Sequence, residues 1–208
     1  MEPRERIERE IAAYFDGRLA AHGPTHLATD HNSEEARTVR FAQIVRLLDP
    51  GEECSVLDYG CAYGALAGYL EERGFRCRYT GFDLAESMVA EARRLYPEGP
   101  GRIFTSKPAD LRPSDFVLAC AIFNRRGNHP VAEWERYVLD TIERVAALGV
   151  KGFAFSLLTS YADPPKMRDD LYYADPCRMF DLCKRRYSRN VALLHDYGIY
   201  DFTILVRR

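Results

Sequence analysis

Long apolar runs, paired cysteine motifs and an excess of charge of one sign are all missing from this 208-residue sequence. No apolar run approaches the roughly 18 residues that a membrane-spanning helix requires, and the charged start contains no apolar segment typical of a secretory signal. The six cysteines form no CxxC pair, which argues against a zinc site. We therefore expect a reduced, cytoplasmic protein with no membrane partner and no metal.

The charges are nearly balanced, with 29 Lys and Arg against 31 Asp and Glu and a formal net charge of -2. This balance provides no electrostatic reason to bind a long nucleic acid. Repeats, low-complexity segments and linkers are absent as well, and 47% of the residues are hydrophobic. We predict a single domain over residues 1–208, as a monomer or homodimer, with residues 1–50 as a helical extension or lid and residues 51–208 as the core.

Apolar residues recur at helical spacing in the first twenty residues and again from Ser33 to Leu48, and strands and helices alternate afterwards. Strands are predicted at 54–58, 76–83, 103–104, 115–123, 150–158, 191–195 and 199–206, and helices at 63–73, 86–96, 131–148 and 176–187. The pattern predicts an α/β fold with a doubly wound, mostly parallel seven-stranded sheet. The last two strands are too close in sequence for a crossover helix, so we expect an antiparallel strand at the C-terminus.

The most informative stretch is residues 56–64, VLDYGCAYG, where a strand ends in Asp58 and a glycine turn leads into a helix. Gly60 and Gly64 allow a ligand to approach the backbone closely, and either can adopt positive φ. Asp83 follows Gly64 at about the 20-residue spacing expected of an acid that binds a ribose. Together these features favour a site for a nucleoside-containing cofactor over a merely structural turn.

The cofactor is not expected to be a dinucleotide. The dinucleotide fingerprint is G-x-G-x-x-G, and here no third glycine follows in register. Asp58 stands just before the first glycine, where it would repel a pyrophosphate but would suit an ammonium group or a bound water. An NAD-type oxidoreductase is therefore disfavoured.

Residues 56–64 resemble the first motif of the class I S-adenosylmethionine-dependent methyltransferases, with Ala62 in place of the usual middle glycine. Residues 81–88, GFDLAESM, resemble the second motif, and residues 108–111, PADL, stand where the family presents a polar group to the adenine. The resemblance covers roughly residues 50–208. It implies S-adenosyl-L-methionine as cofactor and S-adenosyl-L-homocysteine as product. The implied cofactor-binding residues are Asp58, Gly60, Cys61, Ala62, Tyr63, Gly64, Asp83, Leu84, Met88 and Asp110. Met88 would pack on the adenine, although an ordinary core methionine explains it equally well.

The candidate catalytic residues lie in two places. A loop before the first strand contains His26 and His31, and in this family such a segment often folds over the cofactor, so either histidine could act as a base. Alternatively, this is a solvated loop with a helix cap, and its spacing matches no regular metal site. Asn124 follows the fourth strand, where it could bind cofactor or substrate or could simply cap the loop.

Tyrosines follow the fifth strand and are candidates for substrate binding. Tyr161, Tyr172 and Tyr173 stand among several aspartates, which suits a polyhydroxylated or amine-bearing ligand. A tyrosine-rich surface loop would look the same.

The resemblance implies a small-molecule methyltransferase, with oxygen favoured over nitrogen as acceptor, of the kind found in natural-product or surface-sugar biosynthesis. The N-P-P-Y motif typical of base-modifying amino methyltransferases is absent, which weighs against nucleic acid as a substrate. Two alternatives remain open: a cofactor-binding scaffold or regulatory subunit without catalysis, indicated only by Ala62, and an RNA methyltransferase.

Overall fold

The computed structural model describes residues 3–208, which divide into two compact units. The first unit comprises residues up to Phe41 and residues 49–112, and the second comprises residues 42–48 and 113–208. No helix among the described residues is long and apolar enough to cross a membrane.

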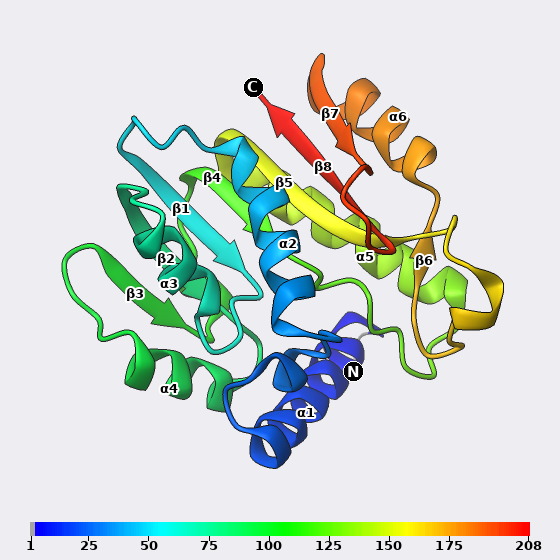
Figure 1. Ribbon diagram of the computed structural model, residues 1–208, viewed down its shortest axis with the longest axis horizontal. Helices are drawn as coiled ribbons and strands as arrows, with labels where there is room; N and C mark the ends of the chain where they lie inside the picture. The colour runs from blue at the N-terminus through cyan, green and yellow to red at the C-terminus, as the bar shows by residue number, and fades with distance from the viewer. Residues whose placement is uncertain (1–2) are drawn as a thin grey trace. The chain divides into compact units, whose positions relative to one another are not determined.

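The first unit contains the N-terminal helices and three alternating strand–helix pairs (Figure 1). Its elements are α1 (Pro3–His22), η1 (His26–Thr29), most of α2 (Glu34–Ile44), β1 (Cys54–Tyr59), α3 (Ala65–Glu72), β2 (Cys77–Phe82), α4 (Glu86–Leu95), β3 (Arg102–Thr105) and η3 (Pro108–Asp110). The predicted loop around His26 therefore contains one turn of 3-10 helix.

The three strands of the first unit are parallel, in the order β3–β2–β1. Their register pairs Asp58 with Gly81 and Phe82 with Thr105. The carboxyl ends of the strands consequently lie along one edge, where doubly wound sheets bind their ligands.

Helix α1 packs against η1 and α4 in this unit. Phe15 and Leu19 contact a buried cluster that includes Ala85 and Met88. The Ser87 hydroxyl of α4 donates to Asp16 of α1. The apolar spacing of α1 thus attaches the N-terminal helix to the segment that follows β2.

The second unit contains the remaining strands and two long helices. Its elements are the end of α2, η2 (Val45–Leu47), β4 (Ser114–Ala119), α5 (Val131–Leu148), β5 (Gly149–Thr159), η4 (Pro164–Lys166), β6 (Tyr173–Ala174), α6 (Pro176–Arg186), β7 (Asn190–Leu194) and β8 (Asp201–Arg207). β4 and β5 are parallel, whereas β8 runs antiparallel to both β5 and β7, as the short connection before it predicted.

Two details differ from the sequence prediction. The strand predicted at 115–123 ends at Ala119, because Ala121 adopts a φ of 58° and turns the chain. The two-residue β6 pairs with β5 and was not predicted. Strands this short contain too little alternation to be recognised in a sequence.

Candidate functional site

The loop after β1 has a left-handed backbone at three positions. Gly60 has a φ of 89°, Ala62 of 47° and Gly64 of 83°. The amides of Gly60 and Cys61 donate to the carbonyl of Phe82 at 2.7 and 2.9 Å, which ties the loop to the end of β2. A non-glycine residue at positive φ is strained. The positive φ at position 62 therefore explains why the motif usually has glycine there.

Gly64 is constrained by its neighbours as well as by its backbone. A Cβ on this residue would lie 3.0 Å from the Tyr96 ring and 3.2 Å from the Phe104 ring. Only glycine satisfies both the backbone angle and the space, and α3 begins directly after it. α3 therefore begins directly at the end of this loop.

Asp83 supports this loop from the end of β2. One carboxylate oxygen accepts from the Ala62 amide at 2.8 Å and the other from the Ala85 amide at 2.9 Å. Burial raises the pKa of Asp83 to about 6, against the lowering effect of these two amides. Each carboxylate oxygen has a second lone pair, so Asp83 can still accept from two ribose hydroxyls.

Asp58 is 2% exposed and has an unexpected partner. The hydroxyl of Tyr79 donates to its Oδ2 at 2.5 Å. Burial raises the pKa of Asp58 to about 7, Tyr79 opposes this shift, and the charge of Asp83 adds to it. The edge of the sheet therefore holds a buried carboxylate, Asp58, and a half-buried one, Asp83, and neither forms an ion pair with a lysine or arginine of residues 3–208.

The other predicted cofactor residues lie around this loop. Tyr63 is buried, and its hydroxyl accepts from Arg37. Cys61 is buried too, and burial together with Asp58 and Asp83 raises the pKa of its thiol. Leu84 is half-buried. Met88 is fully buried in the cluster with Ala28, Tyr63 and Ala85, so the structure places it in the core beside the loop.

Asp110 lies at the end of η3 and is exposed. Its Oδ2 accepts from the Thr105 hydroxyl at 2.8 Å. Since Thr105 is paired with Phe82 in the sheet register, Asp110 is brought to the same edge as Asp83. All the predicted cofactor residues thus belong to the first unit and lie at or after the carboxyl ends of β1, β2 and β3.

The two candidate histidines have different surroundings. The Nδ1 of His26 is 3.2 Å from Oε1 of Glu34, and the His26 ring is partly exposed. His31 is buried, with Nδ1 2.9 Å from a guanidinium nitrogen of Arg40. Burial, followed by the charges of Arg40, Arg37 and His26, lowers the pKa of His31 to about 3. His31 is therefore neutral and held in place, whereas His26 is accessible and oriented by a carboxylate.

Asn124 lies in the second unit and uses its side chain within that unit. Its Oδ1 accepts from the Leu158 amide at 3.2 Å, and its Nδ2 is 3.5 Å from Oδ1 of Asp201. Its backbone carbonyl also accepts from the Tyr172 amide. These are the contacts expected of a residue that caps the loop.

The three candidate tyrosines are not equivalent. Tyr161 is 68% exposed, whereas Tyr172 is buried and its pKa is raised to about 12, chiefly by burial. The Tyr173 hydroxyl accepts from the Arg168 amide at 3.1 Å. Tyr161 is therefore the most accessible of the three side chains.

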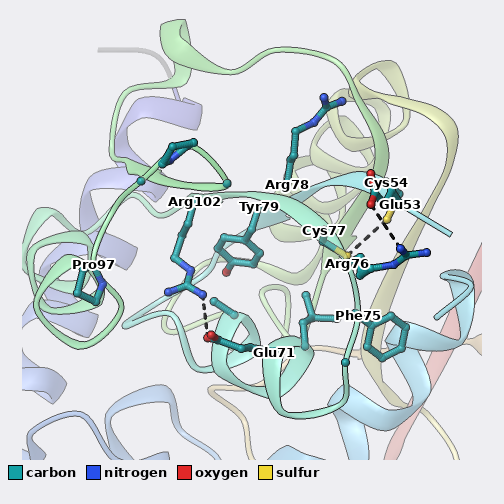
Figure 2. Close-up of a pocket in the computed structure, with 16 residues that line it drawn as sticks. Glu53, Cys54, Glu71, Phe75, Arg76, Cys77, Arg78, Tyr79, Pro97 and Arg102 are labelled. Atoms are coloured by element: carbon teal, nitrogen blue, oxygen red, sulfur yellow. Dashed lines mark hydrogen bonds and ion pairs between the residues drawn. The ribbon is translucent and has the colours of Figure 1, made fainter. Parts of the chain in front are cut away.

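A separate cleft of about 840 Å³ lies at the amino ends of β1 and β2 (Figure 2). Ion pairs flank it, Arg102 with Glu71 and Arg76 with Glu53, and the ring of Tyr79 lines it. Because ligands of doubly wound sheets bind at the carboxyl ends of strands, this cleft is not the cofactor site.

Reading the sequence missed three residues that the structure brings to the site, namely Glu34, Arg37 and Tyr79. Glu34 and Arg37 begin α2, and their charges follow the cap residue Ser33, whose Oγ accepts from the Ala36 amide. Acids in a first helical turn usually only complement the helix dipole, so nothing indicated a partner for His26. Tyr79 looked like one more apolar residue of a buried strand.

Comparison with known proteins agrees with this geometry. The model of the family described as "Methyltransferase domain" matches residues 56–147. A Mycobacterium tuberculosis protein classed by name as a methyltransferase, Rv1506c, is 47% identical over 164 residues, which cover 79% of this chain and 99% of that protein. The chain therefore belongs to the class I S-adenosylmethionine-dependent methyltransferases, and S-adenosylmethionine is its cofactor.

More distant similarities indicate the fold and the range of the family. A malonyl-[acyl-carrier protein] O-methyltransferase of Enterobacter lignolyticus is 25% identical over 78% of this chain and 59% of its own length. The crystal structure of human N-acetylserotonin methyltransferase has a TM-score of 0.66 at 16% identity, covering 100% of this chain and 60% of that one. The N-methyltransferase NodS of Bradyrhizobium japonicum has a TM-score of 0.64 at 14% identity, covering 95% and 98%.

The residues present fit this cofactor. Gly60 and Gly64 leave the backbone of the loop open to close approach, and Asp83 has lone pairs left for two hydroxyls. Asp58, which is buried, and Asp83, which is half-buried, have no cationic side chain paired with them among residues 3–208, and this suits a ligand that carries a sulfonium and an ammonium group. In this description Asp83 would hold the ribose, and Asp58 would supply negative charge beneath the loop.

Proposed function

We propose that this protein transfers a methyl group from S-adenosylmethionine to an oxygen of a small-molecule acceptor, with His26 as general base. A chain of polar contacts within the first unit supports this. Glu34 contacts the His26 ring, Arg37 pairs with Glu34, and Arg37 donates to Tyr63 of the cofactor loop. A histidine oriented by a carboxylate beside the cofactor loop is suited to remove a proton.

Oxygen is favoured as the acceptor atom because a hydroxyl group needs a general base to remove its proton. When bound, the cofactor supplies an electrophilic methyl group on its sulfonium. A hydroxyl becomes a good nucleophile only as its proton leaves, whereas an unprotonated amine needs no base. Glu34 holds the ring of His26 in one orientation, and the exposed part of the ring can reach an acceptor. His31 is less suitable, since its lowered pKa makes it a weak base.

We call Asp58, the loop of residues 60–64 and Asp83 the cofactor cradle. The cradle would contribute mainly by positioning the cofactor. Asp83 would accept from the ribose hydroxyls, and Gly60 and Gly64 would let backbone amides approach the bound molecule. Holding two reactants in line can supply about 7–11 kcal/mol of the barrier. The helical segment 1–50 would act as a lid, a role supported by the packing of α1 against η1 and α4. We propose further that both units work as one domain, since the family model spans residues of both.

The class of acceptor follows from the same reasoning. An exposed Tyr161 and its neighbouring acids would suit a polyhydroxylated molecule, as expected in natural-product or surface-sugar biosynthesis. The names of similar proteins include both an O-methyltransferase and N-methyltransferases, so similarity alone favours neither atom.

The test is to measure S-adenosylhomocysteine formation with a panel of phenols, hydroxy acids and sugars, each beside its amine counterpart. Mass spectrometry of the products identifies the methylated atom. We expect O-methylation, and a loss of about 10²–10⁴-fold in kcat for His26→Gln with unchanged cofactor affinity. The His31→Gln variant, matched in chemistry, should retain most of the rate if it folds.

Methylation of the amines alone, or an unaffected rate in His26→Gln, would reject the proposal. Cofactor binding without turnover on any acceptor would favour the scaffold alternative. Turnover with RNA fragments but not with small molecules would favour the RNA alternative.

A further inference from the structure

Tyr79 connects a buried strand position with the cofactor cradle. Its side chain is buried in β2, where it lines the cleft at the amino ends of the strands (Figure 2). Its hydroxyl lies 2.5 Å from Oδ2 of Asp58, which is itself buried at the end of β1. A phenylalanine would fill the same space in the core, so the hydroxyl has a purpose other than packing.

The hydrogen bond acts on the charge of Asp58. A carboxylate is stabilised in its ionised form when it accepts a hydrogen bond, and burial has the opposite effect. Among the described residues, Tyr79 is the one side chain that donates to Asp58. The other titratable groups near the pair are Asp83 and Cys61, with Arg102 near Tyr79 and Asp16 near Asp83. None of these pairs with Asp58.

We propose that Tyr79 is a positioning residue that keeps Asp58 ionised and fixed beneath the loop, so that the cradle accepts a positively charged cofactor. The proposal rests on the cradle assigned above. The charge of Asp58 is effective because it lies in a buried, low-dielectric environment two residues before Gly60. Tyr79 remains protonated while it does this, since burial and the adjacent Asp58 raise the pKa of its phenol far above the ordinary value.

This arrangement links cofactor binding to pH. The pKa of Asp58 is raised to about 7 in the cofactor-free protein. A cationic ligand favours the ionised carboxylate, so affinity should increase as the pH rises through this value. Removing the Tyr79 hydroxyl raises the pKa further and moves the increase to higher pH. A shift of about one pH unit weakens binding about tenfold below the midpoint and leaves binding at high pH nearly unchanged.

The experiment is calorimetric binding of S-adenosylmethionine to the full chain from about pH 5.5 to about pH 9, for the wild type and Tyr79→Phe. Tyr187→Phe is the matched control, because Tyr187 also donates to a carboxylate, that of Glu143 at 2.8 Å, in the second unit. Asp58→Asn completes a double-mutant cycle. We expect the affinity curve to move to higher pH in Tyr79→Phe only, and Tyr79→Phe to have no further effect in the Asp58→Asn background.

Identical affinity curves for the wild type and Tyr79→Phe would overturn the proposal. It would also be overturned if Tyr79→Phe moved the affinity curve of the Asp58→Asn variant as far as it moves that of the wild type. Should Tyr79→Phe fail to fold, the wild type alone provides a test. Binding at about pH 6.5 in buffers of different ionisation enthalpy should reveal proton release, and its absence would contradict the linkage. No binding by the wild type at any pH would instead overturn the cradle itself.

Discussion

Both units contain acidic side chains at a candidate site, but the acids of the two units differ in their partners. Asp58 and Asp83 of the first unit have raised pKa values, mainly through burial, and no lysine or arginine of residues 3–208 pairs with them. Asp170 of the second unit contacts both Arg125 and Arg168. Burial is the largest single influence and raises its pKa, but the hydrogen bond from Arg168 and the charges of Arg125 and Arg168 together lower it overall.

The difference is the one expected between carboxylates that await a cationic ligand and a carboxylate that is already ion-paired. A buried carboxylate without a counter-charge is costly, and the protein tolerates it where a ligand supplies the missing charge. A carboxylate paired with two arginines is already satisfied. The sequence favours a cofactor site in the first region and leaves the second open between substrate binding and a tyrosine-rich surface loop, and the environments of their acids differ.

The largest expected effect is on cofactor affinity. Asp83→Ala removes a carboxylate that supports the loop and would hold two hydroxyls, each worth about 1.5–3 kcal/mol, so affinity should fall by about 10²–10⁴-fold. Calorimetry with S-adenosylmethionine measures this. Asp170→Ala, the matched change in the second unit, should leave affinity within about twofold. Equal losses in the two variants would contradict the distinction between the units.

The second effect is the pH dependence of stability without cofactor. Acids whose pKa is raised in the folded state stabilise it below their unfolded pKa, and this contribution is lost as the pH rises to the folded pKa. For Asp58 the loss occurs between the ordinary pKa of an aspartate, 3.8, and about 7, and amounts to about 2–4 kcal/mol. Denaturant unfolding of the wild type and Asp58→Asn should show a weaker decline in the variant.

Asp170 provides the opposite case for the same measurement. Its lowered pKa stabilises the folded protein above the unfolded pKa, and this contribution disappears as the pH falls. Asp170→Asn should therefore lose stability at neutral pH, and this loss should shrink as the pH falls below about 3.8. A parallel response of Asp58→Asn and Asp170→Asn would show that the two environments do not differ in this way.

A third, smaller effect concerns packing beneath the cradle. Gly81 is paired with Asp58 in the register, and a Cβ there would lie 2.5 Å from the Phe104 ring and 2.9 Å from Sγ of Cys61. Gly81→Ala should reduce the free energy of unfolding by about 1–3 kcal/mol and also weaken cofactor binding. Gly152→Ala in β5 would crowd the Val206 carbonyl and should destabilise without affecting affinity. Gly99→Ala, with open space around it, should change neither quantity.

The smallest effect tests the two strained alanines. Ala62 and Ala121 have φ values of 47° and 58°, one in each unit. Glycine relieves the strain of about 1–2 kcal/mol but increases the entropy of the unfolded chain, so each substitution should change stability by less than about 1 kcal/mol. Only Ala62→Gly should alter S-adenosylmethionine affinity, because only this loop belongs to the cradle. A comparable change in affinity for Ala121→Gly would contradict the claim that only the loop containing Ala62 belongs to the cradle.

The alternation of strands and helices, the glycine turn after β1 and the spacing to Asp83 are local patterns, and they were sufficient to predict the α/β fold, its antiparallel end and the cofactor. Each depends on backbone periodicity or on residues close in sequence. The prediction of strand ends was less accurate where a single backbone angle ends the strand, as the positive φ of Ala121 does after β4. The two-residue β6 was missed because its pairing with β5 is not encoded in so short a pattern.

Only the tertiary structure decided what each polar side chain does. It pairs His26 with Glu34, buries His31 against Arg40, places Met88 in the core and brings the Tyr79 hydroxyl to Asp58. These outcomes depend on burial and on contacts between residues distant in sequence, which determine desolvation and charge. The sequence by itself therefore determined the family and the position of the cradle, because those follow from local spacing. The protonation and the partners of the acids and histidines were determined by packing.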